Sequence, residues 1–138
     1  MRFMVLVKAN KDSEAGVLPT KGQLDEMGAF NDELIKAGVM LAGDGLQASS
    51  KGARITFSGD RQTVTDGPFA ETKELVAGFW IIQAKSKDEA IEWMRRAPFQ
   101  DETIEIRQLF EAEDFGDALS AEAKEREQRL RAKLDAQR

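Results

Sequence analysis

The sequence predicts an α+β fold in which one antiparallel sheet carries two helices. Three observations support this fold: apolar residues alternate or run unbroken in some segments, they recur at helical spacing in others, and glycine, proline and aspartate separate the segments. The chain has 138 residues, which suggests one main domain. Its 41% hydrophobic and 33% charged residues are typical of a globular protein.

The first part of the chain predicts a strand, a loop and a helix. Residues 3–7 form a short apolar run with β-branched side chains, which favours a buried strand, and residues 9–19 are polar and indicate a loop. Residues 20–37 predict a helix, because Thr20 and Gln23 have the spacing of a capping box. We expect its apolar face to contain Leu24, Met27, Leu34 and Ile35, and its flank to contain Phe30.

The middle of the chain predicts short strands joined by turns. Residues 39–46 are apolar but interrupted by Gly43 and Gly45, so we expect a strand that ends in a tight turn or a bulge. Residues 54–58 alternate between apolar and polar side chains, as a strand with two different faces does. A Gly-Asp turn follows, and residues 62–65 then predict a short return strand.

The last part of the domain predicts a strand, a helix and a strand. Residues 75–84 are rich in large apolar side chains and predict a central strand. Ser86 and Glu89 repeat the capping-box spacing and open a helix over residues 86–97, which a proline closes. Residues 103–110 alternate and predict a final strand.

Without the short inserted strand at residues 54–58 and its return strand, the elements follow the order βαββαβ, which is the order of a ferredoxin-like fold with both helices on one face of an antiparallel sheet. In the central strand, Trp80 and Ile82 point to one face, and Phe79 and Ile81 point to the other. Both sets are apolar, whereas two helices cover only one face. We therefore expect a second copy of the chain to cover the other face, which predicts a homodimer.

Residues 111–138 are mostly charged, so we expect the domain to span residues 1–110 and a charged helical C-terminal extension to follow. Ser120 is a candidate N-cap for a helix in this extension. Its Glu–Arg pairs at a spacing of four residues are Glu122/Arg126, Glu125/Arg129 and Glu127/Arg131. Two interpretations stay open: a solvated helix that packs on the domain or on a partner chain, and a frayed charged tail.

The composition excludes many kinds of chemistry. The chain contains no cysteine and no histidine, which excludes disulfides, thiolate-bound or imidazole-bound metals, a thiol nucleophile and His-based catalysis. The net charge of −5 disfavours nucleic acid as a partner. The apolar start of the chain is too short for a signal peptide, and no run of about 18 apolar residues is present. We therefore expect no membrane partner and a cytoplasmic location.

The charged residues after the predicted return strand are the first candidates for a site. Asp66 precedes a glycine and a proline, and it has two interpretations: a turn residue whose carboxylate accepts a backbone N–H while Gly67 takes a positive φ, or a catalytic acid or base in a cleft. Lys73 is the second catalytic candidate, as a cation near Asp66 or near an anionic ligand. Glu71 lies between them and is a candidate ligand-binding residue, or part of a solvated turn.

Three further residues are candidates for ligand binding. Asp44 lies between two glycines, which allow a ligand or a second backbone to approach closely. Arg54 lies on the polar face of its strand and has the geometry to bind a carboxylate or a phosphate. Lys8 ends the first strand. The spacing of the acidic residues matches no metal-binding loop, so we expect no metal and no cofactor.

Five segments together resemble one known family. In chain order they are Gly43-Asp44-Gly45-Leu46, Asp66-Gly67-Pro68-Phe69-Ala70-Glu71-Thr72-Lys73-Glu74, Ala77-Gly78-Phe79-Trp80-Ile81-Ile82, Asp88-Glu89-Ala90-Ile91-Glu92-Trp93 and Ile104-Glu105-Ile106-Arg107. These segments resemble the DGPF, or YCII-related, family over about residues 1–110. The resemblance implies a dimeric α+β barrel of ferredoxin-like units. It also implies a polar cleft, whose His–Asp pair in one branch of the family has no counterpart here because histidine is absent.

Two functions follow as hypotheses. The first is a homodimer with a polar cleft near the Asp66-Gly67-Pro68-Phe69 turn. This cleft either binds a small anionic or polar metabolite or acts on it as an enzyme. The second is a non-catalytic regulatory or interaction module, in which the charged C-terminal helix is the interaction surface. Because some members of the family occur beside sigma factors, the resemblance connects this second hypothesis with sigma-factor-dependent transcription.

Overall fold

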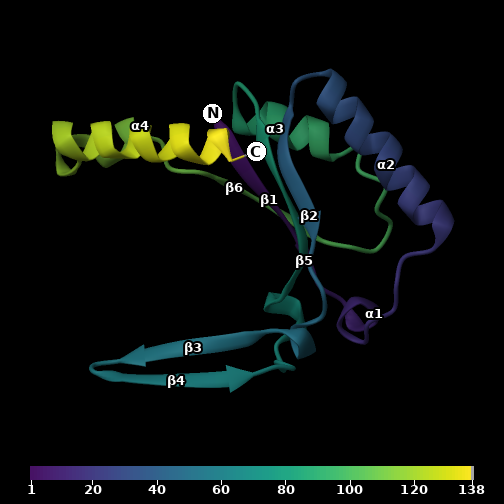
Figure 1. The fold of residues 1–138 in the computed structure, drawn as a ribbon. Coiled ribbons are helices and arrows are strands. Elements are labelled where there is room, and N and C mark those ends of the chain that lie inside the picture. The colour runs from purple at the N-terminus through teal and green to yellow at the C-terminus, as the bar shows by residue number, and fades with distance from the viewer. Residues whose placement is uncertain (138) are drawn as a thin grey trace. The chain divides into compact units, whose positions relative to one another are not determined.

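A computed structural model describes residues 1–137 and confirms the ferredoxin-like α+β fold. Contacts divide the chain into two compact units, Met1–Gln108 and a second unit that begins at Leu109. The first unit contains a four-stranded antiparallel sheet in the order β2-β5-β1-β6 and a separate hairpin of β3 and β4 (Figure 1). The strands are β1 (Arg2–Lys8), β2 (Met40–Gly45), β3 (Ala53–Ser58), β4 (Arg61–Asp66), β5 (Val76–Gln83) and β6 (Ile104–Gln108).

The two long helices of this unit begin where the capping residues predict. In α2 (Lys21–Lys36), the Gln23 backbone N–H donates to Thr20 Oγ1 at 3.2 Å, and the Thr20 N–H donates to Gln23 Oε1 at 2.9 Å. In α3 (Lys87–Met94), the Glu89 N–H donates to the hydroxyl of Ser86 at 3.1 Å. These bonds satisfy backbone donors that a helix N-terminus leaves without partners.

A short helix was not expected in residues 9–19, which were predicted to be a loop. There α1 (Lys11–Glu14) forms one helical turn behind a capping box, in which the backbone N–H groups of Asn10 and Ser13 each donate to the other residue's side chain at 2.9 Å. One turn has no apolar period, so the pattern that predicts helices does not detect it. Two 3₁₀ turns, η1 (Ser49–Lys51) and η2 (Thr72–Glu74), flank the hairpin.

The core lies between the sheet and the two long helices, which Figure 1 shows on the same side of the sheet. Its buried residues are Phe3, Val5, Phe30, Leu34, Val39, Trp80, Ile82, Ala84, Ala90 and Met94. One expectation was wrong: Phe30 is buried and meets Trp80 edge to face at 5.9 Å, whereas Leu24 and Ile35 are exposed. The helix is rotated from its expected orientation, because burying the Phe30 ring against Trp80 removes more apolar surface from water than burying Leu24 would.

Neither α2 nor α3 covers the other face of the sheet, and we call this face the open face. The strand pairing aligns Asp44 with Phe79, Phe79 with Leu6, and Leu6 with Glu105 in one row across the sheet. The next row contains Ala42, Ile81, Met4 and Arg107. The centre of the open face is therefore apolar and only half buried, and its charged residues lie at the β2 and β6 edges.

The second unit contains η3 (Ala112–Ala118) and α4 (Ala121–Ala136). Ser120 caps α4 as predicted, since its hydroxyl accepts the N–H of Ala123 at 3.1 Å. Two of the predicted ion pairs form, Arg131–Glu127 at 3.1 Å and Arg129–Glu125 at 4.0 Å. Within residues 1–137, no helix combines the length and the apolar character needed to cross a membrane.

Candidate functional site

The Asp66-Gly67-Pro68-Phe69 turn is packed tightly against the loop that follows β2. The Gly67 N–H donates to the carbonyl of Gly52 at 3.0 Å, and a Cβ on Gly67 would lie 1.8 Å from the carbonyl oxygen of Ser49. The expectation that Gly67 takes a positive φ was wrong, because its φ lies outside that region. Glycine is needed here since the Ser49 backbone occupies the space of a side chain.

A hydrogen-bonded chain connects this turn to α1. The Phe69 N–H donates to Ser49 Oγ at 3.0 Å, and Ser49 Oγ donates to Glu14 Oε2 at 2.5 Å. The Ser49 N–H donates to Glu14 Oε1 at 3.0 Å. Glu14 is the residue that sequence reasoning missed, and the capping box that forms α1 was the available signal for it. Its carboxylate is half buried and fixes the position of the loop from which the hairpin emerges.

Arg54 and Glu71 come together beside this turn. Arg54 Nη1 lies 3.6 Å from Glu71 Oε2, and its guanidinium lies over the Phe69 ring, 3.8 Å from the centroid. Both charged side chains are about half exposed. Arg54 also lines a hollow of about 460 Å³ together with Lys51 and Glu14. The arrangement gives an open, mostly water-exposed hollow whose guanidinium already has an anionic partner.

The two residues predicted to be catalytic lie at different places on the surface. Asp66 ends β4, opposite Ala53, and is exposed. Lys73 is also exposed and lines a separate hollow of about 310 Å³ with Lys8 and Glu102, and Asp66 is not part of that lining. Lys8 Nζ lies 3.5 Å from Glu105 Oε1. Catalytic roles for Asp66 and Lys73 stay predictions.

An aromatic pocket of about 300 Å³ lies where β2 and β5 meet α2. Its lining residues are Val7, Pro19, Met27, Asn31, Gly43, Asp44, Gly45, Ala77, Gly78, Phe79, Trp80 and Phe99. The indole N–H of Trp80 donates to Asn31 Oδ1 at 2.9 Å, and the Trp80 and Phe99 rings meet at 6.0 Å with their planes at 63°. The hydrogen bond fixes the orientation of the indole, so the aromatic wall is preformed.

Glycines keep this pocket open. A Cβ on Gly43 would lie 2.9 Å from Trp80 Cδ1, and a Cβ on Gly78 would lie 3.2 Å from the Asp44 carbonyl oxygen. Gly43 thus admits the Trp80 side chain, which is the close approach that the sequence indicated for the glycines beside Asp44, whereas a Cβ on Gly45 would meet nothing within 4 Å. Among the described residues of this lining, Asp44 is the one that carries a charge.

The strand pairing shows on which side of the pocket this charge lies. Asp44 is aligned with Phe79, and paired residues in a sheet share a face, so its carboxylate lies on the open face and not on the Trp80 side. The carboxylate therefore belongs to the rim of the pocket. Any molecule that covers the open face comes close to this rim.

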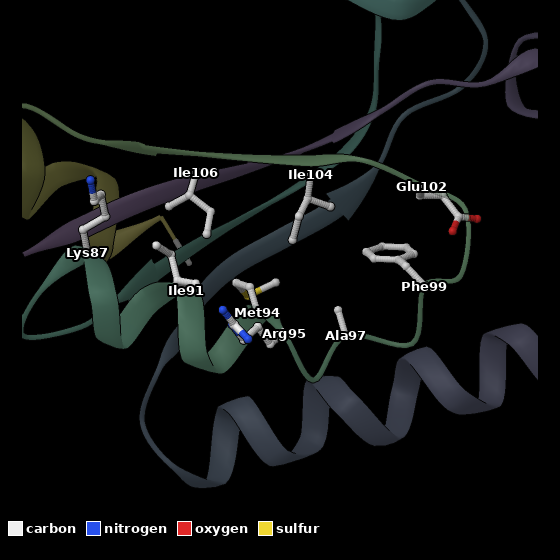
Figure 2. A pocket seen from close by; sticks show the side chains of 9 residues that line it. All are labelled: Lys87, Ile91, Met94, Arg95, Ala97, Phe99, Glu102, Ile104 and Ile106. Atoms are coloured by element: carbon white, nitrogen blue, oxygen red, sulfur yellow. The ribbon is translucent and has the colours of Figure 1, made fainter.

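A groove of about 550 Å³ lies between α3 and β6. Figure 2 shows Ile104 and Ile106 of β6 pointing toward Ile91 and Met94 of α3, with Glu102 at one end of the groove. Lys87 and Arg95 also belong to its lining. The groove has an apolar floor with charges at the rim, and it shares Phe99 with the aromatic pocket but lacks Trp80 in its lining. Residues 1–137 contain no cluster of three or more acidic side chains placed to bind a metal ion.

The sheet order, the inserted hairpin and the glycine-lined pocket beside β2 define a ferredoxin-like α+β protein with one open sheet face. A family model, the YCII-related domain, matches residues 1–113. The chain belongs to the YCII-related family.

Two individual proteins are similar to this chain. An uncharacterised protein of Rhizobium meliloti (strain 1021) is 34% identical over 70 residues, which are 51% of this chain and 56% of that protein. A solved structure of 5-chloro-2-hydroxyhydroquinone dehydrochlorinase (TftG) from Burkholderia phenoliruptrix AC1100, in complex with 2,5-dihydroxybenzoquinone, aligns with a TM-score of 0.39 and 16% identity. The alignment covers 83% of this chain and 98% of that one.

Proposed function

We propose that this protein is a small-molecule-binding homodimer whose ligand occupies the aromatic pocket. The observation that carries this proposal is the preformed wall of Trp80, Phe99 and Asn31, next to a single carboxylate at the rim. Small-molecule sites are mostly apolar cavities of about 300–1,000 Å³ with a few polar groups that fix the orientation of the ligand. The aromatic pocket has this size and this composition.

The side chains of the aromatic pocket favour ligands with a planar ring and disfavour anions. Flat rings stack on aromatic side chains, and the Asp44 carboxylate accepts hydrogen bonds and repels anions. The ligand is therefore a polar molecule with a planar ring and a hydroxyl or amine donor, rather than an anion. The hollow beside Arg54 suits an anion better, but its guanidinium is stacked on Phe69 and lies near Glu71.

The homodimer is supported by the open face. The apolar centre of this face is half buried in the single chain and is not covered by α2 or α3; it consists of Met4, Leu6, Phe79 and Ile81. A second copy stacked on this face removes these side chains from water, which is the main driving force for association. Because Asp44 lies on the same face, the rim of the pocket then borders the dimer interface.

A thermal-shift screen against planar polar metabolites tests the ligand proposal. A ligand at 100 times its Kd adds about 2.7 kcal/mol of stability, which raises the Tm of a chain of this size by roughly 5–15 °C. We expect Asp44→Asn to lose this shift, and Asp66→Asn, which changes an acid outside the pocket, to keep it. Loss of the shift in Asp66→Asn alone would move the site to the turn, and the absence of any stabilising compound would contradict the proposal.

The second candidate function is a non-catalytic regulatory or interaction module whose partners are components of sigma-factor-dependent transcription. It is favoured by one observation: the second unit, which begins at Leu109, is compact in itself and leaves Leu130 and Leu134 exposed on α4. Removing residues 116–138 tests it in a pull-down. If this function is correct, the truncated protein folds but loses its partner, whereas the aromatic-pocket proposal expects ligand binding to be unaffected.

A further inference from the structure

The β3–β4 hairpin has two chemically different faces. The pairing aligns Ile55 with Val64 and places Phe57 on the same face, opposite Gln62. The other face contains Arg54, Thr56, Ser58, Arg61, Thr63 and Thr65. In the single chain Ile55 is 55% exposed, Val64 66% and Phe57 70%. An apolar stripe of three large side chains is thus more than half exposed to water.

Such a hairpin does not hold its shape by itself. An isolated two-stranded hairpin in water is marginally stable at best, and it needs packing on its apolar face. The core and the side chains packed against it include no residue of this hairpin. Its base, in contrast, is firmly held by the bond between the Phe69 N–H and Ser49 Oγ and by the close approach of Gly67 to Ser49. The structure fixes where the hairpin starts and leaves its apolar face without a cover.

The position of the hairpin indicates what covers it. Figure 1 shows β3 and β4 extending from one end of the sheet, away from α2 and α3 and on the side of the open face. A strand of six residues spans roughly 20 Å, whereas two stacked sheets lie about 10 Å apart. A hairpin of this length extends past the plane of a second sheet stacked on the open face. A second copy seated on the open face therefore also reaches the apolar face of the hairpin.

The charges of the open face fit this occupant. Asp44 lies at the β2 edge, and Arg107 lies at the β6 edge together with Glu105, which is also close to Lys8. A two-fold axis parallel to the strands, between two stacked sheets, places the β2 edge of each copy over the β6 edge of the other. Because this rotation keeps each row at its own level, Asp44 of each copy then lies opposite Glu105, which is 3.5 Å from Lys8 and 4.0 Å from Arg107. These three residues together carry a net charge of +1, so each acidic β2 edge faces a net positive β6 edge.

We propose that the β3–β4 hairpin is a dimerisation arm whose face of Ile55, Phe57 and Val64 packs on a second copy of this chain seated on the open face. This inference rests on the homodimer proposed above, and it adds which segment holds the two copies together. It also explains why a hairpin with an apolar stripe is anchored so tightly at its base: a fixed base directs the arm toward the partner.

Light scattering after size exclusion tests the arm with two neighbouring substitutions. Phe57→Asp places a charge on the apolar face, and Thr56→Asp places the same charge on the polar face of the same strand. Both positions are exposed in the single chain, so neither change disturbs the core. We expect wild type and Thr56→Asp to elute as dimers of about 31 kDa, twice 15.4 kDa, and Phe57→Asp to raise the dimer Kd at least tenfold.

Two outcomes overturn the proposal, and they are distinguishable. If wild type and both variants are dimers of equal Kd, the arm is wrong while the homodimer stands. If the wild type is a monomer of about 15 kDa at 200 µM, the homodimer fails and the arm fails with it.

If Phe57→Asp does not fold, a cross-linking experiment tests the arm, and Phe57 is replaced by p-benzoylphenylalanine. Irradiation should then cross-link two copies at position 57 but not at position 56, and the absence of that cross-link contradicts the arm.

Discussion

Gly67 shows how a single residue obtains its role from a distant neighbour. The sequence interpretation rested on backbone conformation, because glycine before proline in a turn often takes a positive φ. The structure gives a different reason, since the Ser49 carbonyl oxygen lies where a Cβ would be. The local sequence does not contain this information: Ser49 is 18 residues away, and only the folded chain brings the two segments together.

We expect Gly67→Ala to destabilise the protein by about 1–3 kcal/mol, because the backbone around Ser49 must move to admit the methyl group. Gly52→Ala is the matched control in the same junction. Its Cβ would lie 3.5 Å from the nearest atom, and its φ of −113° suits any residue, so we expect a change within about 0.5 kcal/mol. Urea unfolding of both variants measures the difference, and equal stabilities would contradict the packing interpretation.

Asn31 holds the aromatic wall through one hydrogen bond. Trp80 is buried, so Asn31→Ala leaves its indole N–H without an acceptor, and we expect a loss of about 1–3 kcal/mol. Asn31→Asp keeps an acceptor oxygen and should stay closer to wild type. Chemical denaturation followed by tryptophan fluorescence measures both. If Asn31→Ala is as stable as Asn31→Asp, the hydrogen bond does not stabilise the wall.

The elements that carry a capping residue or an apolar period were predictable from the sequence. Elements without such a local signal were not. The capping residues Thr20 and Ser86 mark helix starts that the structure confirms. In contrast, α1 is a single turn without a period, and the rotation of α2 that buries Phe30 depends on Trp80, 50 residues further along the chain. Local patterns give the type and order of elements, whereas rotation and contacts are set by packing between distant segments.

The same limit applies to the candidate site. Arg54 and Glu71 were each predicted as candidates for ligand binding, and the structure brings their side chains within 3.6 Å of each other. The aromatic pocket was not predicted apart from Asp44, because its wall comes from α2, β5 and the loop before β6. The glycines of β2 were the sequence signal for a close approach. They do not tell whether a ligand, a side chain or another strand approaches.

The cap of α2 allows a test of how strongly local signals stabilise this helix. Thr20→Ala removes the hydroxyl that accepts the Gln23 N–H, and we expect a loss of about 0.5–2 kcal/mol. Thr20→Ser keeps the hydroxyl and should stay within about 0.5 kcal/mol of wild type. Thermal unfolding by circular dichroism compares the two. Similar losses in both variants would show that the threonine acts through its methyl group and not through the cap.

The two units also differ in what they contribute to stability. All buried core residues of the described chain lie between Phe3 and Met94. We therefore expect a chain of residues 1–108 to fold and to unfold cooperatively, with a Tm within about 3 °C of the full chain. Calorimetry of both chains measures this. A large drop in Tm or the loss of cooperativity would show that residues after 108 stabilise the first unit.

The charged edges of the open face make the proposed two-fold arrangement testable through charge reversal. Asp44→Lys makes the β2 edge positive, and Arg107→Asp changes the group of Lys8, Glu105 and Arg107 from a net charge of +1 to −1, so each change gives the two facing edges charges of the same sign. An exposed ion pair contributes about 0.2–1 kcal/mol, so the two pairs together correspond to roughly a 2- to 30-fold rise in dimer Kd. We expect the double variant to recover most of this loss, because it restores opposite charges across the interface, and the effect should shrink in 1 M salt. Sedimentation of the four proteins measures these constants. If the two losses simply add in the double variant, the edges that carry Asp44 and Arg107 do not face each other, and the two copies are arranged differently.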